Sequence, residues 1–194
     1  MPNSALLVMD IQKSIVERVP DQDYLPRLRG AVEAARAAAV PVIHVVVGFR
    51  DGHPEAHPRN KSFGALPAAA FTAADPGSAI HPDVAPRPGE TVVTKRRVSA
   101  FTGSDLDVVL RAGDIDTLVL TGIATSGVVL STLRQAADLD YRLVVLSDGC
   151  LDADPEVHRV LTEKVFPRQA DVTTIADWTG AVATVDGRKP FTIR

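Results

Sequence analysis

Short apolar runs alternate with amphipathic segments along this chain, and each run has the length and the β-branched content of a buried strand. The predicted strands are residues 5–9, 42–47, 91–94, 117–120, 142–147 and 172–175. Apolar residues recur at helical spacing within 24–39 and 128–136, while Ser104 and Asp154 stand where they can cap two further helices. This alternation predicts a three-layer α/β/α fold with a mainly parallel sheet of six strands.

Residues 48–89 break the pattern. They are rich in Pro, Gly, Ala and charged residues, and any helical pieces in them are short. A connection of this length inside a compact domain is more often a binding loop or lid than filler. The tail from Gly187 to Arg194 is polar and has no core pattern.

Length and composition indicate one globular domain spanning residues 1–194, with 45% hydrophobic and 23% charged residues. A net charge of −3 provides no basic footprint for nucleic acid or for a membrane surface. No apolar run approaches the roughly 20 residues of a membrane helix, and the first residues do not resemble a signal peptide. With Cys150 as the one cysteine, no internal disulfide can form, so we expect a cytoplasmic protein that acts on a small molecule.

Polar residues follow three of the predicted strands directly. Asp10 follows the first strand, Lys95 the third, and a turn of small and hydroxyl residues at 121–127 the fourth. Each alone fits a loop cap or a solvated strand end. Because the carboxyl ends of parallel strands share one edge, however, together they predict a carboxylate, an ammonium group and backbone donors in one cleft. The cation would favour the ionised carboxylate, and burial would oppose it.

Three segments carry a family resemblance: ALLVMDIQ at 5–12, TVVTK at 91–95 and DTLVLTGIATSGVVLST at 116–132. Together they resemble the isochorismatase-like (cysteine hydrolase) family, which includes nicotinamidases and isochorismatases, over roughly residues 4–180. The resemblance implies an Asp, a Lys and a Cys as catalytic residues, at Asp10, Lys95 and position 128. Position 128 is Val.

The resemblance also implies a cis peptide at Ile123–Ala124 and an oxyanion site built from the backbone N–H groups of Ala124 and Val128. Gln12, in the first motif, is a further candidate for substrate contact. Phe101 follows Lys95 closely and is a candidate for packing against a planar substrate, although a role in the core is equally consistent with the sequence.

Val128 cannot act as a nucleophile, because an isopropyl group has neither a lone pair nor an acidic proton. Cys150 reads as a small buried hydrophobe, and no His is positioned by sequence to activate the hydroxyls near the turn. Isochorismatases, which this chain resembles, lack the Cys and protonate a vinyl ether with the Asp. We therefore expect a Cys-independent hydrolase with Asp10 as general acid or base, and with Lys95 holding substrate carboxylates or orienting the acid.

Two alternatives stay open: a nicotinamidase-type amidase, and a catalytically silent member that binds a small ligand. Asp51, His53 and His57 resemble the metal-binding Asp and His residues of nicotinamidases, but the Trp-Pro-x-His-Cys segment that follows there is absent. Such loops are more often surface turns, so we predict no cofactor and keep a divalent metal as the alternative.

The nearby Arg50, Arg59, Asn60, Lys61 and Phe63 are instead candidates for an anion-binding wall. His44 and His158 are candidates for structural roles. Family members often form dimers or tetramers, so we expect a homo-oligomer.

Overall fold

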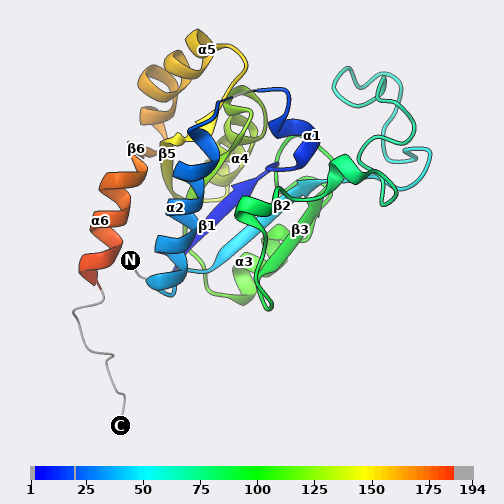
Figure 1. The fold of residues 1–194 in the computed structure, drawn as a ribbon. Coiled ribbons are helices and arrows are strands. Elements are labelled where there is room, and N and C mark those ends of the chain that lie inside the picture. The colour runs from blue at the N-terminus through cyan, green and yellow to red at the C-terminus, as the bar shows by residue number, and fades with distance from the viewer. Residues whose placement is uncertain (1–2, 20, 186–194) are drawn as a thin grey trace.

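The computed structural model describes residues 3–19 and 21–185, and within them six parallel strands form one sheet (Figure 1). The strand order is β3-β2-β1-β4-β5-β6. The strands are β1 (Ser4–Met9), β2 (Val42–Val47), β3 (Thr91–Lys95), β4 (Thr117–Ile123), β5 (Arg142–Leu151) and β6 (Asp171–Thr173). The chain adds strands on one side of β1 and then on the other, so a topological switch point lies between β1 and β4.

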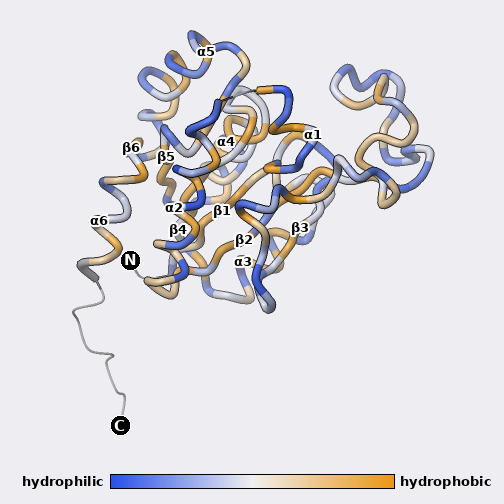
Figure 2. Tube along the Cα trace, viewed as in Figure 1, coloured by the Kyte–Doolittle hydropathy of each residue, from blue (hydrophilic) through white to orange (hydrophobic). Residues whose placement is uncertain are grey.

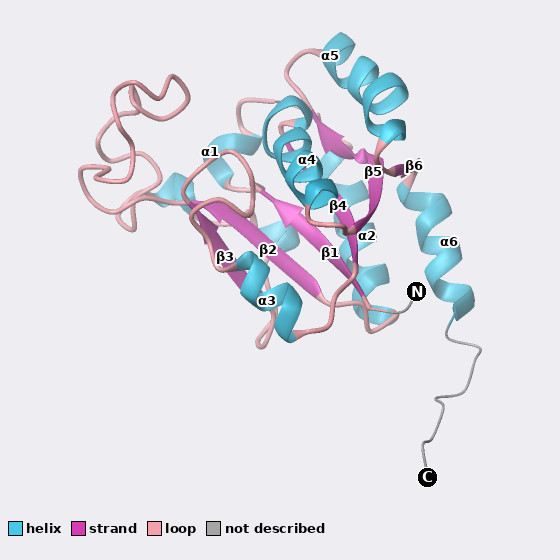
Figure 3. Ribbon diagram, turned by 180° about the vertical axis from the view of Figure 1, so that it is seen from behind, coloured by secondary structure: helices cyan, strands magenta, loops and turns pink. Residues whose placement is uncertain are grey.

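Helices cover both faces of the sheet (Figures 1 and 3). One face carries α2 and α6, and the other carries α3, α4 and the segment from η4 to η5. The helices are α1 (Lys13–Val16), α2 (Tyr24–Ala37), α3 (Leu106–Ala112), α4 (Leu130–Asp138), α5 (Pro155–Val160) and α6 (Ile175–Val185). Shorter turns are η1 (Pro76–Ser78), η2 (Pro82–Val84), η3 (Thr125–Val129), η4 (Leu161–Val165) and η5 (Phe166–Arg168). The predicted three-layer α/β/α fold is confirmed.

The two central strands are buried from end to end. Every residue of β1 and of β4 is buried, as expected for parallel strands with helices on both faces. Figure 2 shows this hydrophobic centre along β1. None of the helices in the described ranges has the length and apolar character that a membrane crossing requires.

The last predicted strand, 172–175, is wrong in its second half. β6 ends at Thr173, and Ile175 begins α6 instead. Ile175, Trp178 and Val182 recur at helical spacing and pack on the α2 face, while the Thr174 hydroxyl accepts a hydrogen bond from the Asp177 N–H at 3.1 Å. This capping pattern was visible in the sequence and was missed. The tail from Gly187 to Arg194 lies outside the described residues.

The 48–89 connection extends away from the sheet as a long loop, drawn in cyan to green in Figure 1. It is not structureless, because Phe49 and Phe71 form a small buried cluster with Val47 at the end of β2. Phe63 and Leu66 pack against this cluster. The loop is therefore attached to the carboxyl edge of the sheet by its own apolar contacts.

An ion pair ties α2 to the start of β3. Arg36 forms two hydrogen bonds of 2.7 Å with the carboxylate of Glu90, and both side chains are largely buried. Glu90 also accepts a hydrogen bond from the Arg87 N–H and lies 3.4 Å from Nε2 of His44. The hydrogen bond from Arg36 is the main cause that lowers the pKa of Glu90 to about 2.

We predict that Glu90→Gln lowers the free energy of unfolding by up to about 3 kcal/mol near neutral pH. Because the folded-state pKa lies below the unfolded value, this contribution is complete above pH 4.5 and disappears as the pH falls towards 2. Urea unfolding of the wild type and the variant at several pH values measures the difference. The exposed Glu17→Gln serves as control, and a difference independent of pH would contradict the prediction.

Candidate active site

Asp10 and Lys95 meet in a buried ion pair at the carboxyl edge of the sheet. Asp10 follows β1, Lys95 is the last residue of β3, and Nζ of Lys95 lies 2.9 Å from Oδ2 of Asp10. Their side chains are 8% and 1% exposed. Lys95 also donates a hydrogen bond to the carbonyl of Arg97, at 3.0 Å. The proximity predicted from the strand ends is thus confirmed.

Asp10 keeps one carboxyl oxygen unused. Its Oδ1 is buried and has no hydrogen-bond partner among the described residues. Burial raises the pKa of Asp10 above its usual value, because the loss of hydration outweighs the opposing charge and hydrogen bond of Lys95 and the weaker influence of the Val47 backbone N–H. The backbone of Asp10 is left-handed, with φ of 58°, a conformation that Asp tolerates better than most residues. This carboxyl group can therefore hold a proton and pass it to a bound molecule.

The turn after β4 contains the expected cis peptide between Ile123 and Ala124. Before it, Gly122 has φ of 149°, and a Cβ there would lie 2.5 Å from the carbonyl oxygen of Met9, so only Gly fits. After it, the backbone bends sharply at Gly127. These features shape the η3 segment that carries Val128.

Side chains of residues that follow β5 form hydrogen bonds with the turn. Asp152 accepts a hydrogen bond of 2.7 Å from the Ser126 N–H, and Nδ1 of His158, on α5, lies 2.8 Å from the Thr125 hydroxyl. The sequence did not place a His near these hydroxyls; the fold does. Thr125 is fully buried and does not line the cavity described next, so the Thr125–His158 pair stabilises the turn and presents no nucleophile.

A cavity of about 270 Å³ opens beside the ion pair. Its walls are mainly apolar and come from four connections at the carboxyl edge, including the 48–89 loop. The lining residues are Asp10, Ile15, Arg18, Val47, Ser62, Phe63, Leu66, Phe71, Lys95, Val98, Ile123, Ala124, Gly127 and Val128. The cavity thus contains Asp10, Lys95 and the turn, as predicted from sequence, and also Arg18, which the sequence analysis did not single out.

Val128 stands in the cavity wall and is 2% exposed, and its isopropyl group offers no nucleophile there. Cys150 cannot supply the nucleophile instead. The thiol of Cys150 is buried on β5, its Sγ lies 3.8 Å from the Leu120 carbonyl, and burial raises its pKa to about 12. A thiol that remains protonated and has no access to the cavity cannot serve as the nucleophile.

Two candidates for substrate contact lie elsewhere. Gln12 is fully buried and does not line the cavity: its amide donates to the carbonyls of Val47 and Ser78 and accepts from the Val47 N–H. It therefore joins the end of β2 to the long loop. Phe101 packs in the core with its ring centroid 6.0 Å from that of Tyr141, which corresponds to the alternative left open for it.

The candidate metal ligands are not assembled. Among the described residues, no group of three His, Cys, Asp or Glu side chains is placed to hold a metal ion. His53 bonds through Nε2 to the Ala70 carbonyl at 2.7 Å, and His57 accepts the Arg59 N–H at 3.0 Å. The residues present therefore do not fit a divalent cation. Of the suggested anion-binding wall, Phe63 lines the cavity, whereas the Arg50 guanidinium pairs with Glu55.

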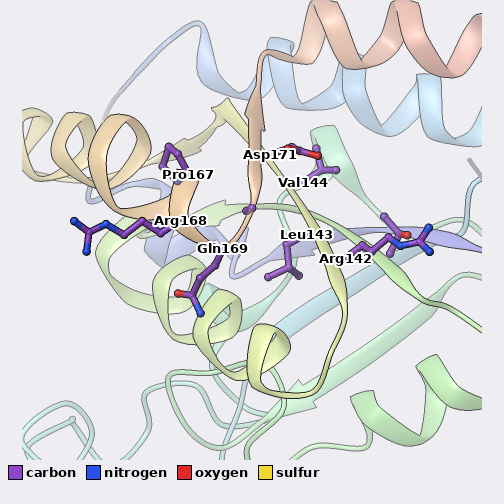
Figure 4. Close-up of a pocket in the computed structure, with 9 residues that line it drawn as sticks. Arg142, Leu143, Val144, Pro167, Arg168, Gln169 and Asp171 are labelled. Carbon is purple, nitrogen blue, oxygen red and sulfur yellow. The ribbon is translucent and has the colours of Figure 1, made fainter.

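A larger cavity, of about 520 Å³, lies at the opposite edge of the sheet, where β4, β5 and β6 begin (Figure 4). Its two cations, Arg142 and Arg168, point away from each other. No pair of charged groups converges there as Asp10 and Lys95 do. The carboxyl edge is therefore the candidate active site.

Comparisons with known proteins identify the family of the chain. The family model described as "Isochorismatase domain" matches residues 4–177. A ureidoacrylate amidohydrolase of Stutzerimonas stutzeri is 35% identical, over 94% of this chain and 80% of its own length. The structure of an isochorismatase family protein from Burkholderia thailandensis superposes with a TM-score of 0.82 at 34% identity, covering 94% of this chain and 97% of that one. An N-carbamoylsarcosine amidase from Thermoplasma acidophilum gives a TM-score of 0.71 at 25% identity, with coverage of 89% and 96%.

We expect Lys95→Met to lower the free energy of unfolding by about 3–5 kcal/mol at neutral pH, because the Asp10 carboxylate would remain buried without a partner. Without the cation the folded-state pKa of Asp10 rises further above its unfolded value, so the loss shrinks as the pH falls and the carboxyl becomes neutral. Denaturant titrations of both proteins at acidic and neutral pH test this. Lys164→Met, at an exposed position, is the control, and a loss that grows towards acidic pH would refute the account.

We expect the folded protein to resist alkylation by iodoacetamide, since Cys150 is buried and its pKa is about 12. Intact-mass measurement should show modification only after unfolding in urea, with the activity unchanged by treatment of the native protein. Rapid modification of the native protein with loss of activity would instead restore Cys150 as a nucleophile.

Proposed function

The chain belongs to the isochorismatase family of hydrolases, and we propose that it hydrolyses a small polar metabolite without a covalent intermediate, using Asp10 as general acid or base. The observation that carries this proposal is the unpaired Oδ1 of Asp10, buried in the wall of a cavity whose nucleophile position is the aliphatic Val128. A carboxyl group and a water molecule are then the reactive groups that the site supplies.

The first candidate reaction is the hydrolysis of a vinyl ether of the isochorismate type. Protonated Asp10 donates its proton to the terminal vinyl carbon, and water adds to the resulting oxocarbenium carbon and returns a proton to Asp10. The hemiketal then breaks its C–O bond to release the alcohol and the keto acid. The raised pKa of Asp10 supports this role, because it increases the fraction of carboxylic acid available at a given pH.

Lys95 holds the acid in place. Its ammonium group bonds Oδ2 of Asp10 and the Arg97 carbonyl, so Oδ1 is the oxygen left for the substrate. When the proton leaves, the same ammonium group stabilises the carboxylate that forms. With both bonds made and 1% exposure, Lys95 orients the acid and is not available to hold a substrate carboxylate.

The second candidate is hydrolysis of an amide or ureido bond, which the names of the ureidoacrylate amidohydrolase and N-carbamoylsarcosine amidase relatives favour. Here ionised Asp10 removes a proton from water, which adds to the carbonyl carbon. The tetrahedral intermediate then breaks its C–N bond, and the leaving nitrogen takes the proton from Asp10. The N–H groups of Ala124 and Val128 are the candidates for stabilising the oxyanion, because both residues line the cavity beside Asp10.

The deciding experiment measures pyruvate released from isochorismate and ammonia released from ureidoacrylate. We expect Asp10→Asn to lower turnover of the true substrate by at least about a hundredfold, the usual contribution of a general acid or base. Asp138→Asn, an exposed carboxylate at the end of α4, is the matched control and should leave turnover unchanged.

The pH dependence separates the two roles of Asp10. An acid mechanism requires the protonated carboxyl, so kcat/KM falls as the pH rises through the raised pKa; a base mechanism gives the opposite slope. Turnover that survives in Asp10→Asn would refute the proposed role. Absence of turnover of both substrates by the wild type would favour a silent binding protein.

A further inference from the structure

Arg18 lines the active-site cavity with a charge that no other described residue neutralises. It lies two residues beyond α1, where its backbone N–H donates to the Ile15 carbonyl at 3.1 Å. The residue is exposed, and its guanidinium makes no hydrogen bond or ion pair with any described residue. By contrast, Asp10 and Lys95 are buried, so Arg18 marks the solvent side of the cavity.

The charge balance of the cavity points to an anionic ligand. Three charged residues line it: Asp10 and Lys95 offset each other, which leaves the positive charge of Arg18. Three arginines that follow β2 and β3 are already engaged: Arg50 pairs with Glu55, Arg96 bonds the Gly48 carbonyl, and Arg97 bonds the Glu55 carbonyl. The walls of the same cavity include Phe63 and Phe71.

We propose that Arg18 is the anchor for a carboxylate of the substrate, whose apolar or planar body lies between the Phe side chains and whose reacting bond faces Asp10. The planar guanidinium suits a carboxylate because it can donate two parallel hydrogen bonds. Ser62, the uncharged polar side chain in the lining of the described cavity, lies on the long loop and can add a hydroxyl donor. This assignment rests on the proposed function, since it names the substrate class of the same cavity.

The anchor also acts on the chemistry. A carboxylate bound in the cavity brings a negative charge near Asp10, which favours the protonated form of that carboxyl group. A neutral analogue of the same shape would lack both the contact with Arg18 and this effect. The free enzyme would therefore discriminate by charge before any bond is broken.

Benzoate and benzamide test the anchor without requiring turnover, because they are alike in shape and differ in charge. Their dissociation constants are measured by isothermal titration calorimetry on the whole protein. We expect the wild type to bind benzoate at least about tenfold more tightly than benzamide, and Arg18→Gln to lose that preference. Arg18→Lys should retain part of it, and Arg29→Gln, which changes an exposed arginine on α2, should retain all of it.

Asp10→Asn separates this proposal from the proposed function. If Arg18 is the anchor, the benzoate preference persists in Asp10→Asn even though turnover is lost. With a substrate that is turned over, Arg18→Gln should raise KM at least about tenfold and leave kcat within a fewfold of the wild type. Three results would each overturn the assignment. They are equal binding of benzoate by Arg18→Gln and the wild type, equal binding of benzoate and benzamide by the wild type, and no binding of benzoate by the wild type.

Discussion

The ion pair between Asp10 and Lys95 is the interaction on which the rest of the site depends. Its two charges come from strands that are not neighbours, with β2 between them, so the pair exists only once the sheet has assembled. Removing both charges from water costs several kcal/mol for each ion, and their attraction offsets this only in good geometry. The result is a buried carboxyl group in which Lys95 holds one oxygen, Oδ2, while Oδ1 has no hydrogen-bond partner among the described residues.

Several residues around the ion pair maintain this geometry. Gln12 joins the end of β2 to the long loop, and Gly122 allows β4 to approach the carbonyl of Met9. Asp152 and His158 hold the turn from behind. Each of these groups lies outside the cavity lining, yet each determines where a lining residue stands. The site is therefore a property of four connections, and no single motif encodes it.

The isopropyl group of Val128 in the cavity wall supplies no nucleophile. Under the proposed function, the reaction then depends on proton transfer by Asp10 and on how the substrate is held against it. The apolar walls do little by themselves to fix the orientation of a ligand. The proposed anchor, Arg18, would give the ligand a preferred orientation in this cavity.

The sequence by itself determined the fold class, because continuous apolar runs and helical spacing report burial directly, and strand ends in a parallel sheet share one edge. Asp10, Lys95 and the turn predicted at 121–127 were therefore expected to lie together from the sequence alone. Only the tertiary structure decided which groups are free. Gln12 is engaged by backbone, His158 reaches Thr125 across 33 positions, and the guanidinium of Arg18 has no partner among the described residues. Contacts between distant segments depend on how the layers pack, and local sequence patterns do not record that packing.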